Sequence, residues 1–292
     1  MRLELAGSLV RPDPLIIKFN SSQNFDVQKY IDLGYTHFDV ICIGAGGGMG
    51  GGIDTANTGT LVRNYGGAGG GGGFHRVRGL LSALPATVPV VVGAGGSLGA
   101  EHASNPASTT DGGDGGASSF NDPTCRASGG KGGKRAQSNS LTVSTQANGG
   151  DGGLGNRVIA GGGAAGGVAG TPTATGPGTP GTAGVDGTFF QDVGQGGGGG
   201  AGGVGKYGSG GTTCNAATAG GRGSYNPGDT SVYGPADTPD ADPSSGSQSV
   251  IPGGASGAKA APLNGLPAIY GQSKGSRAVG DPGAVILRLT AE

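Results

Sequence analysis

The sequence predicts a mostly β or irregular fold with almost no α-helix. We expect a small β-sandwich-like base formed by both chain ends, carrying a glycine-rich bundle of three-fold, polyglycine II-like helices. Two compositional observations support this: glycine accounts for 72 of the 292 residues, and tryptophan is absent, so a conventional hydrophobic core does not run through the whole chain. The third is spacing, since glycines recur every three residues at Gly196, Gly199, Gly202, Gly205, Gly208 and Gly211.

A period of three fits neither an α-helix nor a β-strand, but it matches an extended left-handed helix with three residues per turn. A second register at Gly194, Gly197, Gly200 and Gly203 leaves two of the three faces without side chains. Such a helix has no internal hydrogen bonds, so its backbone must bond to neighbouring helices. Similar glycine runs occur at 66–73, 112–116, 129–133 and 149–153.

Collagen is a poor interpretation, because the best Gly-X-Y run ends at Gly187 and the chain has only 17 prolines. Disorder is the main alternative, since glycine-rich chains with few aromatic residues bury little apolar surface. Ordering the glycines costs on the order of 100 kcal/mol. An ordered body therefore requires dense backbone hydrogen bonding.

Strands are predicted where glycine is scarce and β-branched residues gather. In chain order these segments are 15–19, 25–27, 38–43, 88–92 and 284–289, with weaker candidates at 141–144 and 158–160. Residues 26–32 fit a short helix and a strand equally well. We expect one composite domain, with a β-rich segment at 1–43, a glycine-rich body with inserted loops and short strands at 44–280, and a C-terminal strand at 281–292 that pairs back to the base.

Two glycine motifs resemble nucleotide-binding loops but lack features that nucleotide binding requires. After the strand at 38–43, the position of the third glycine of a dinucleotide-binding turn is Met49, and no amphipathic helix follows. A phosphate loop at 200–206 lacks its Ser or Thr, because the next residue is Tyr207. We expect no catalytic residues, no cofactor and no metal, and therefore not an enzyme.

Charged residues and histidines give no binding pattern. The chain has 18 basic and 19 acidic residues, which predicts no nucleic-acid partner. Asp111, Asp114 and Asp151 are expected to be solvated at bundle edges. Lys131, Lys134 and Arg135 fit a solvated loop, and His37, His75 and His102 fit surface or strand-edge positions.

The cysteines and the hydropathy pattern likewise indicate no binding site and no membrane segment. Cys42, Cys125 and Cys214 fit neither a disulfide framework nor a zinc site, and Cys42 is expected to be a small buried hydrophobe. No apolar stretch approaches 18 residues and no leading signal segment is found, so we expect no membrane span and assembly inside the cell.

Three junctions between a strand and glycine carry a family resemblance: Phe38 to Gly52, Val90 to Gly96, and Asp281 to Leu289. Their order resembles that of the glycine-rich minor tail proteins of long-tailed bacteriophages, especially those that infect mycobacteria and related actinobacteria. The resemblance extends from about Phe25 to Leu289. The interrupted repeats between Gly96 and Gly149 depart from the family pattern.

This resemblance implies a structural virion protein at the tail tip, assembled in the host cytoplasm and presenting loops for attachment to the host surface. Expected partners are other tail proteins, further copies of the chain and the host cell envelope. Candidate contact residues are Tyr207, Tyr225 and Tyr233, close to loops at 171–180 and 228–246. Alternatives are an adhesin for cell-wall glycan or glycolipid, and a glycine-alanine-rich mycobacterial surface protein, whose helical N-terminal domain is not found in the first 43 residues.

Overall fold

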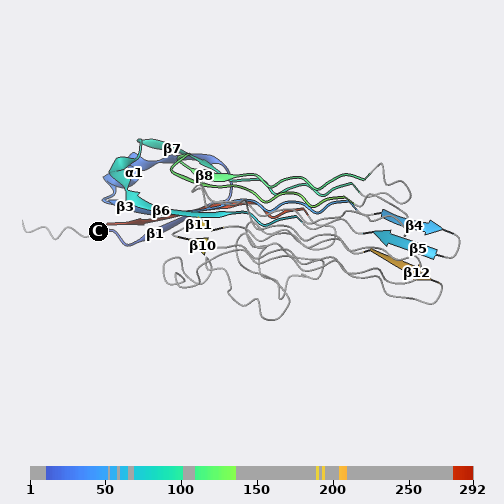
Figure 1. Cartoon of the computed structure of the whole chain (residues 1–292). Helices are drawn as coiled ribbons and strands as arrows, with labels where there is room; N and C mark the ends of the chain where they lie inside the picture. Colours follow the sequence, from blue (N-terminus) through green and yellow to red (C-terminus); the bar gives the residue numbers. More distant parts are fainter. Residues whose placement is uncertain are drawn as a thin grey trace, which may run out of the picture.

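The computed structural model describes residues 11–51, 69–100, 109–135 and 279–291 in full. It also describes the backbones of five further strands, at 53–57, 60–64, 189–190, 193–194 and 204–208. Figure 1 shows a β-rich base at one end and extended glycine-rich segments running side by side away from it.

The base contains two antiparallel sheets. The six-stranded sheet has the order β1-β13-β3-β6-β11-β10. Its strands are β1 (Leu15–Phe19), β13 (Ala284–Thr290), β3 (His37–Ile43), β6 (Phe74–Leu80), β11 (Val193–Gly194) and β10 (Phe189–Phe190). The four-stranded sheet has the order β2-β7-β8-β9. Its strands are β2 (Gln23–Asp26), β7 (Thr87–Val91), β8 (Ser118–Phe120) and β9 (Cys125–Ala127).

Both ends of the described chain meet in the larger sheet, as the sequence predicts. Leu15 of β1 pairs with Leu289 of β13, and β13 in turn pairs with β3 along seven residues, from Ala284 opposite Ile43 to Thr290 opposite His37. The base also takes β6, β7, β8 and β9 from the middle of the chain.

A short helix, α1 (Val27–Asp32), settles the ambiguity at 26–32. Asp26 is its N-cap and accepts a hydrogen bond from the Lys29 N–H at 3.1 Å. Gly34, with φ of 91°, follows the helix in the left-handed conformation that favours glycine. The other helical element in the described residues is the 3-10 turn η1 (Leu81–Ala83).

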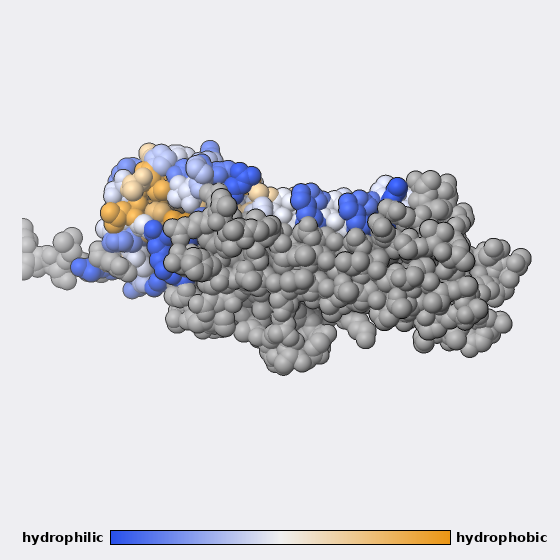
Figure 2. Space-filling view, in the orientation of Figure 1, coloured by the Kyte–Doolittle hydropathy of each residue, from blue (hydrophilic) through white to orange (hydrophobic). Residues whose placement is uncertain are grey.

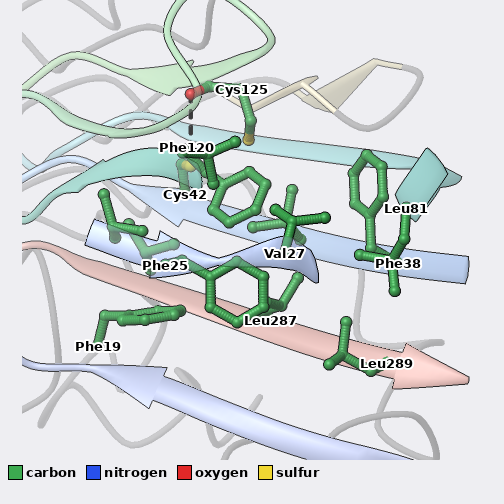
Figure 3. Close-up of a cluster of buried hydrophobic side chains, with 14 of the residues drawn as sticks. Phe19, Phe25, Val27, Phe38, Cys42, Leu81, Phe120, Cys125, Leu287 and Leu289 are labelled. Atoms are coloured by element: carbon green, nitrogen blue, oxygen red, sulfur yellow. Dashed lines mark hydrogen bonds between the residues drawn. The ribbon is translucent and has the colours of Figure 1, made fainter. Parts of the chain in front are cut away.

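The hydrophobic core lies between the two sheets (Figure 3). Phe38, Val40 and Cys42 of β3 face it, whereas the alternate residues Ile41 and Ile43 belong to a second cluster on the other face of the sheet. Phe120 of β8 is fully buried, and its ring centroid lies 6.0 Å from that of Phe38 across the sandwich. Burying a side chain of this size contributes about 1.5–3 kcal/mol.

At the end of the body farthest from the base lies a three-stranded sheet with the order β12-β5-β4 (Figure 1). Its strands are β4 (Ile53–Asn57), β5 (Thr60–Asn64) and β12 (Val204–Gly208). β4 and β5 form a hairpin, with Asn57 opposite Thr60.

Candidate functional site: the glycine lattice

Among the described residues, six extended segments run from the base into the body, and each joins a base strand directly or through one residue. We call them the glycine lattice. They are 44–51 after β3, 69–73 before β6, 93–100 after β7, 109–116 before β8, 128–135 after β9 and 279–283 before β13.

The segment 44–51 lies at the centre of the lattice and is buried along its whole length. Its N–H groups donate to three neighbouring segments in turn, at 2.8–3.0 Å. Gly44 and Gly47 donate to segment 69–73, and Gly46 donates to segment 279–283. Ala45, Gly48 and Gly51 donate to segment 109–116. Its carbonyl groups accept from two more segments, 93–100 and 128–135. The central segment is therefore hydrogen-bonded to five others.

Because the same neighbour recurs every third residue, the backbone makes one turn in three residues. This confirms the three-fold helix bundle predicted from glycine spacing, for the segments that the structure describes. Exposure follows the same period in 93–100, where Gly93, Gly96 and Gly99 are buried and Ala94, Ser97 and Ala100 are exposed.

Where both strands of a base pair lead into lattice segments, their pairing continues into the lattice without a change of register. Ile43 pairs with Phe74 in the sheet, and the next lattice bond joins Gly44 N–H to the Gly73 carbonyl. The β7–β8 and β8–β9 pairs continue in the same way, through Gly116 N–H to Ala94 and Gly115 N–H to Gly130. The base strands thus carry their pairing directly into the glycine body.

Glycine is required in the lattice because neighbouring backbones touch where a side chain would begin. A Cβ atom on Gly48 would overlap the Ser97 carbonyl oxygen, and one on Gly72 would overlap the Gly44 carbonyl oxygen. The obstructing atoms are backbone atoms, which are fixed by the lattice hydrogen bonds. Residues with side chains are therefore confined to positions that face outward or into small gaps.

One edge of the lattice carries paired charges, and Figure 2 shows groups of hydrophilic residues along an edge of the described body. Asp114 accepts from Lys131 Nζ at 2.7 Å and from the Gly132 N–H at 2.9 Å. Asp111 repeats this arrangement three residues away, with Lys134 Nζ and the Arg135 N–H, both at 2.9 Å. The predicted edge position is confirmed for Asp111 and Asp114, whereas Asp151 lies outside the described residues. The lysines lie on a lattice segment rather than in a loop.

These contacts shift the aspartate pKa values. Partial burial acts to raise the pKa of Asp114, but the hydrogen bonds from Lys131 and the Gly132 N–H outweigh it and lower the pKa. The Arg135 N–H and Lys134 likewise outweigh burial and lower the pKa of Asp111. Both carboxylates are therefore ionised acceptors at neutral pH.

The prediction of a surface or strand-edge position for His75 was wrong. His75 lies in β6 and is buried, and its Nδ1 accepts from the Arg126 N–H at 3.1 Å. The backbone N–H of a residue in strand β9, which belongs to the other sheet, gives this ring a partner inside the base.

Two cysteine thiols are buried beside His75. Cys42 is fully buried, as predicted, and its Sγ donates to the Cys125 carbonyl at 3.6 Å. Burial raises the pKa of the Cys42 thiol well above its ordinary value. Both cysteines are free thiols, and Cys42 therefore packs as a small apolar residue.

A buried ion pair lies on the opposite face of the larger sheet. Asp39 of β3 accepts from Nε and a terminal nitrogen of Arg76 in β6, and both side chains are largely buried. Arg78 approaches the same carboxylate at 3.4 Å. A two-bond guanidinium–carboxylate contact of this kind satisfies charges that are costly to bury alone.

The three tyrosines proposed for host contact are only partly placed. Tyr207 lies in strand β12, opposite Leu61 of β5. Tyr225 and Tyr233 lie outside the described residues, as do the loops at 171–180 and 228–246 and the weaker strands at 141–144 and 158–160.

The glycine run at 196–211 follows the prediction least. Gly205 and Gly208 belong to β12, which pairs residue by residue with β5, so this part adopts a strand rather than a three-fold helix. The other glycines of this run lie outside the described residues. In the second register, Gly194 is in β11 and the other three glycines lie outside the described residues.

Neither a metal site nor a membrane helix is found in the part of the chain that the structure describes. No three His, Cys, Asp or Glu side chains come together there, and no helix is long and apolar enough to span a bilayer. A comparison with curated proteins found no match. The glycine-rich domain family matches residues 22–290, a span that includes the sandwich strands from β2 to β13 and all six lattice segments. The chain therefore belongs to the glycine-rich domain family.

Proposed function

We propose that the chain is a structural virion protein of a phage tail tip: a rigid, glycine-rich minor tail protein that presents loops for attachment to the host surface. The observation that carries the proposal is the central segment 44–51, which is hydrogen-bonded to five neighbours. Such a body is stiff without a hydrophobic core. Its sequence also resembles minor tail proteins in the order of its strand–glycine junctions.

The mechanism is rigidity and display. Eight residues of three-fold helix span roughly 25 Å at about 3.1 Å per residue, so the lattice separates the base from the far sheet by a fixed distance. The base holds strands from both chain ends, and we propose that it attaches to other tail proteins or to further copies of the chain. The sheet β12-β5-β4, at the other end, then faces the host envelope.

In this arrangement Tyr207 is the best-placed of the three candidate contact tyrosines, because β12 is part of the far sheet. Tyrosine suits such a role, since it offers a large apolar ring and a polar hydroxyl with little conformational entropy to lose.

The experiment is immunogold electron microscopy of phage particles that carry the gene, with antibodies raised against the purified protein. Particles from a phage with the gene deleted are the control. We expect gold only at the tail tip of the intact particles. Absence of the protein from particles purified on a density gradient would overturn the proposal.

A second measurement separates the scaffold from the adhesin. The purified protein is incubated with host cells, with and without cell-wall glycan as competitor. A scaffold that acts only within the particle leaves the cells unlabelled. Saturable binding that the glycan displaces would instead make the isolated chain an adhesin.

A further inference from the structure

The edge of a glycine lattice poses the same problem as the edge strand of a sheet. An outer segment offers a row of N–H groups at three-residue spacing, and any extended glycine chain with matching carbonyl groups fits that row. Unpaired edges of this type invite association between copies. Segment 128–135 is an outer segment of the described lattice, because Lys131 and Lys134 are exposed.

Two rows of N–H groups on this segment have different partners. Gly130 and Gly133 donate inward, to the carbonyl groups of Ala45 and Gly48. Gly132 and Arg135, also three residues apart, donate to Asp114 Oδ1 and Asp111 Oδ1, each at 2.9 Å. The carboxylates therefore stand where the carbonyl groups of another lattice segment would stand.

The second oxygen of each carboxylate binds a lysine. Lys131 Nζ lies 2.7 Å from Asp114 Oδ2, and Lys134 Nζ lies 2.9 Å from Asp111 Oδ2. These lysine and aspartate side chains are 43–65% exposed, and ion pairs so exposed add little to stability. What they do fix is the direction of each carboxylate, whose first oxygen is held against the N–H row.

We propose that Asp111 and Asp114 close this edge of the lattice against a glycine segment of a second copy of the chain. The carboxylate oxygens of the two aspartates occupy the N–H row of Gly132 and Arg135, so these donors are not available to the carbonyl groups of a second glycine segment. Both glycine lattice and closed edge are features of the described fold, so this inference does not depend on the proposed function.

The test compares three double variants. The first variant, Asp111→Ala with Asp114→Ala, removes the acceptors. The second, Asp111→Asn with Asp114→Asn, keeps a carbonyl oxygen at each position but removes the charge. The third, Lys131→Met with Lys134→Met, removes the ammonium groups and keeps the carboxylates. Sedimentation velocity over a range of protein concentrations measures the self-association of each variant and of wild type.

We expect the association constant of the alanine variant to be at least about tenfold higher than that of wild type. The association constants of the asparagine and methionine variants should stay within about threefold of the wild-type value. An alanine variant that sediments like wild type would overturn the proposal. So would equal association of the alanine and asparagine variants, since charge alone would then keep the copies apart.

Amide hydrogen exchange on the wild-type protein tests the closed edge without any variant. The N–H groups of Gly132 and Arg135 are expected to exchange at least about tenfold more slowly than those of Asp111 and Asp114. Equally fast exchange at all four would mean that the carboxylates do not hold the N–H row, and the proposal would fail.

Discussion

At the scale of single residues, lattice glycines are required by space and not by backbone conformation. Gly34 is the one glycine with a positive φ among the residues that the structure describes, so the φ angles of the lattice are open to other residues. What excludes a side chain is the backbone of the next segment, which lies where the Cβ would be.

This gives the first prediction, Gly48→Ala. In an open site this change stabilises by about 0.4–1 kcal/mol, because it restricts the unfolded chain. Here the Cβ meets the Ser97 carbonyl, and we expect a loss of roughly 1–3 kcal/mol or more in the free energy of unfolding. Chemical denaturation measures it. The control is Ser97→Ala, an exposed lattice position, which should change stability by less than about 0.5 kcal/mol. Stabilisation by Gly48→Ala would refute close packing.

The contacts of Asp111 and Asp114 predict that the free energy of unfolding falls as the pH becomes acidic. Their pKa values are lower in the folded protein, so their contribution to stability is fully present above the unfolded-state value near about 4. It is lost as the pH falls through the folded-state values. Denaturation between acidic and neutral pH should show a smaller loss in the Asp111→Asn, Asp114→Asn variant than in wild type. Identical pH profiles would mean that these carboxylates contribute nothing.

The buried pair of Asp39 and Arg76 supplies a third prediction. Arg76→Met leaves the Asp39 carboxylate without its two-bond partner, and we expect a loss of about 3–5 kcal/mol. The double variant Asp39→Leu, Arg76→Met removes both charges and should recover most of that loss. Denaturant unfolding of both variants gives the comparison. If the double variant is no more stable than the single one, packing rather than charge explains the loss.

At the scale of elements, the base determines which glycine segments become neighbours. The glycine segments share the same dominant residue, so their glycines do not by themselves distinguish one lattice partner from another. The strands do differ in sequence, and a strand pair that leads into two lattice segments passes its register to them, as Ile43 and Phe74 do to Gly44 and Gly73.

Phe120 tests this dependence. Phe120→Ala removes a fully buried ring from the sandwich core and should cost about 3–5 kcal/mol. If the base holds the lattice in register, the N–H groups of Gly113 and Gly116 should lose protection from hydrogen exchange by a similar free energy. Leu33→Ala, at an exposed position in the base, is the control. Unchanged protection of these glycines would show that the lattice holds its register without the base.

The elements also show what sequence reasoning finds and what it misses. Apolar β-branched runs predicted β1, β3, β7 and β13 closely. β6 was missed because His75, Arg76 and Arg78 interrupt its apolar pattern, and their partners lie on other strands. β8 and β9 have three residues each, too few for a period. Glycine spacing predicted the lattice within 66–73, 112–116 and 129–133, whereas residues 281–283 were assigned to the C-terminal strand and belong to the lattice. Which segments become neighbours depends on strand pairing far away in the sequence.

At the scale of the whole molecule, every described lattice segment continues from a strand of the base, so the base and the lattice should unfold together. The main alternative from sequence was a disordered glycine region beside ordered strands. The cooperative and the disordered alternatives differ in the free energy needed to open the amide N–H groups of 44–51, which donate to three other segments in the structure.

Hydrogen exchange in rising denaturant measures that free energy for peptides from 44–51 and from β3 and β13. In a single cooperative unit, all of them open at the global free energy of unfolding. We expect the glycine peptide and the strand peptides to converge on one value, because Gly44 and Gly47 cannot lose their partners in 69–73 without releasing the strand β6 that follows. Early exchange of 44–51, with β3 still protected, would mean that the lattice forms only under the constraint of an assembled particle.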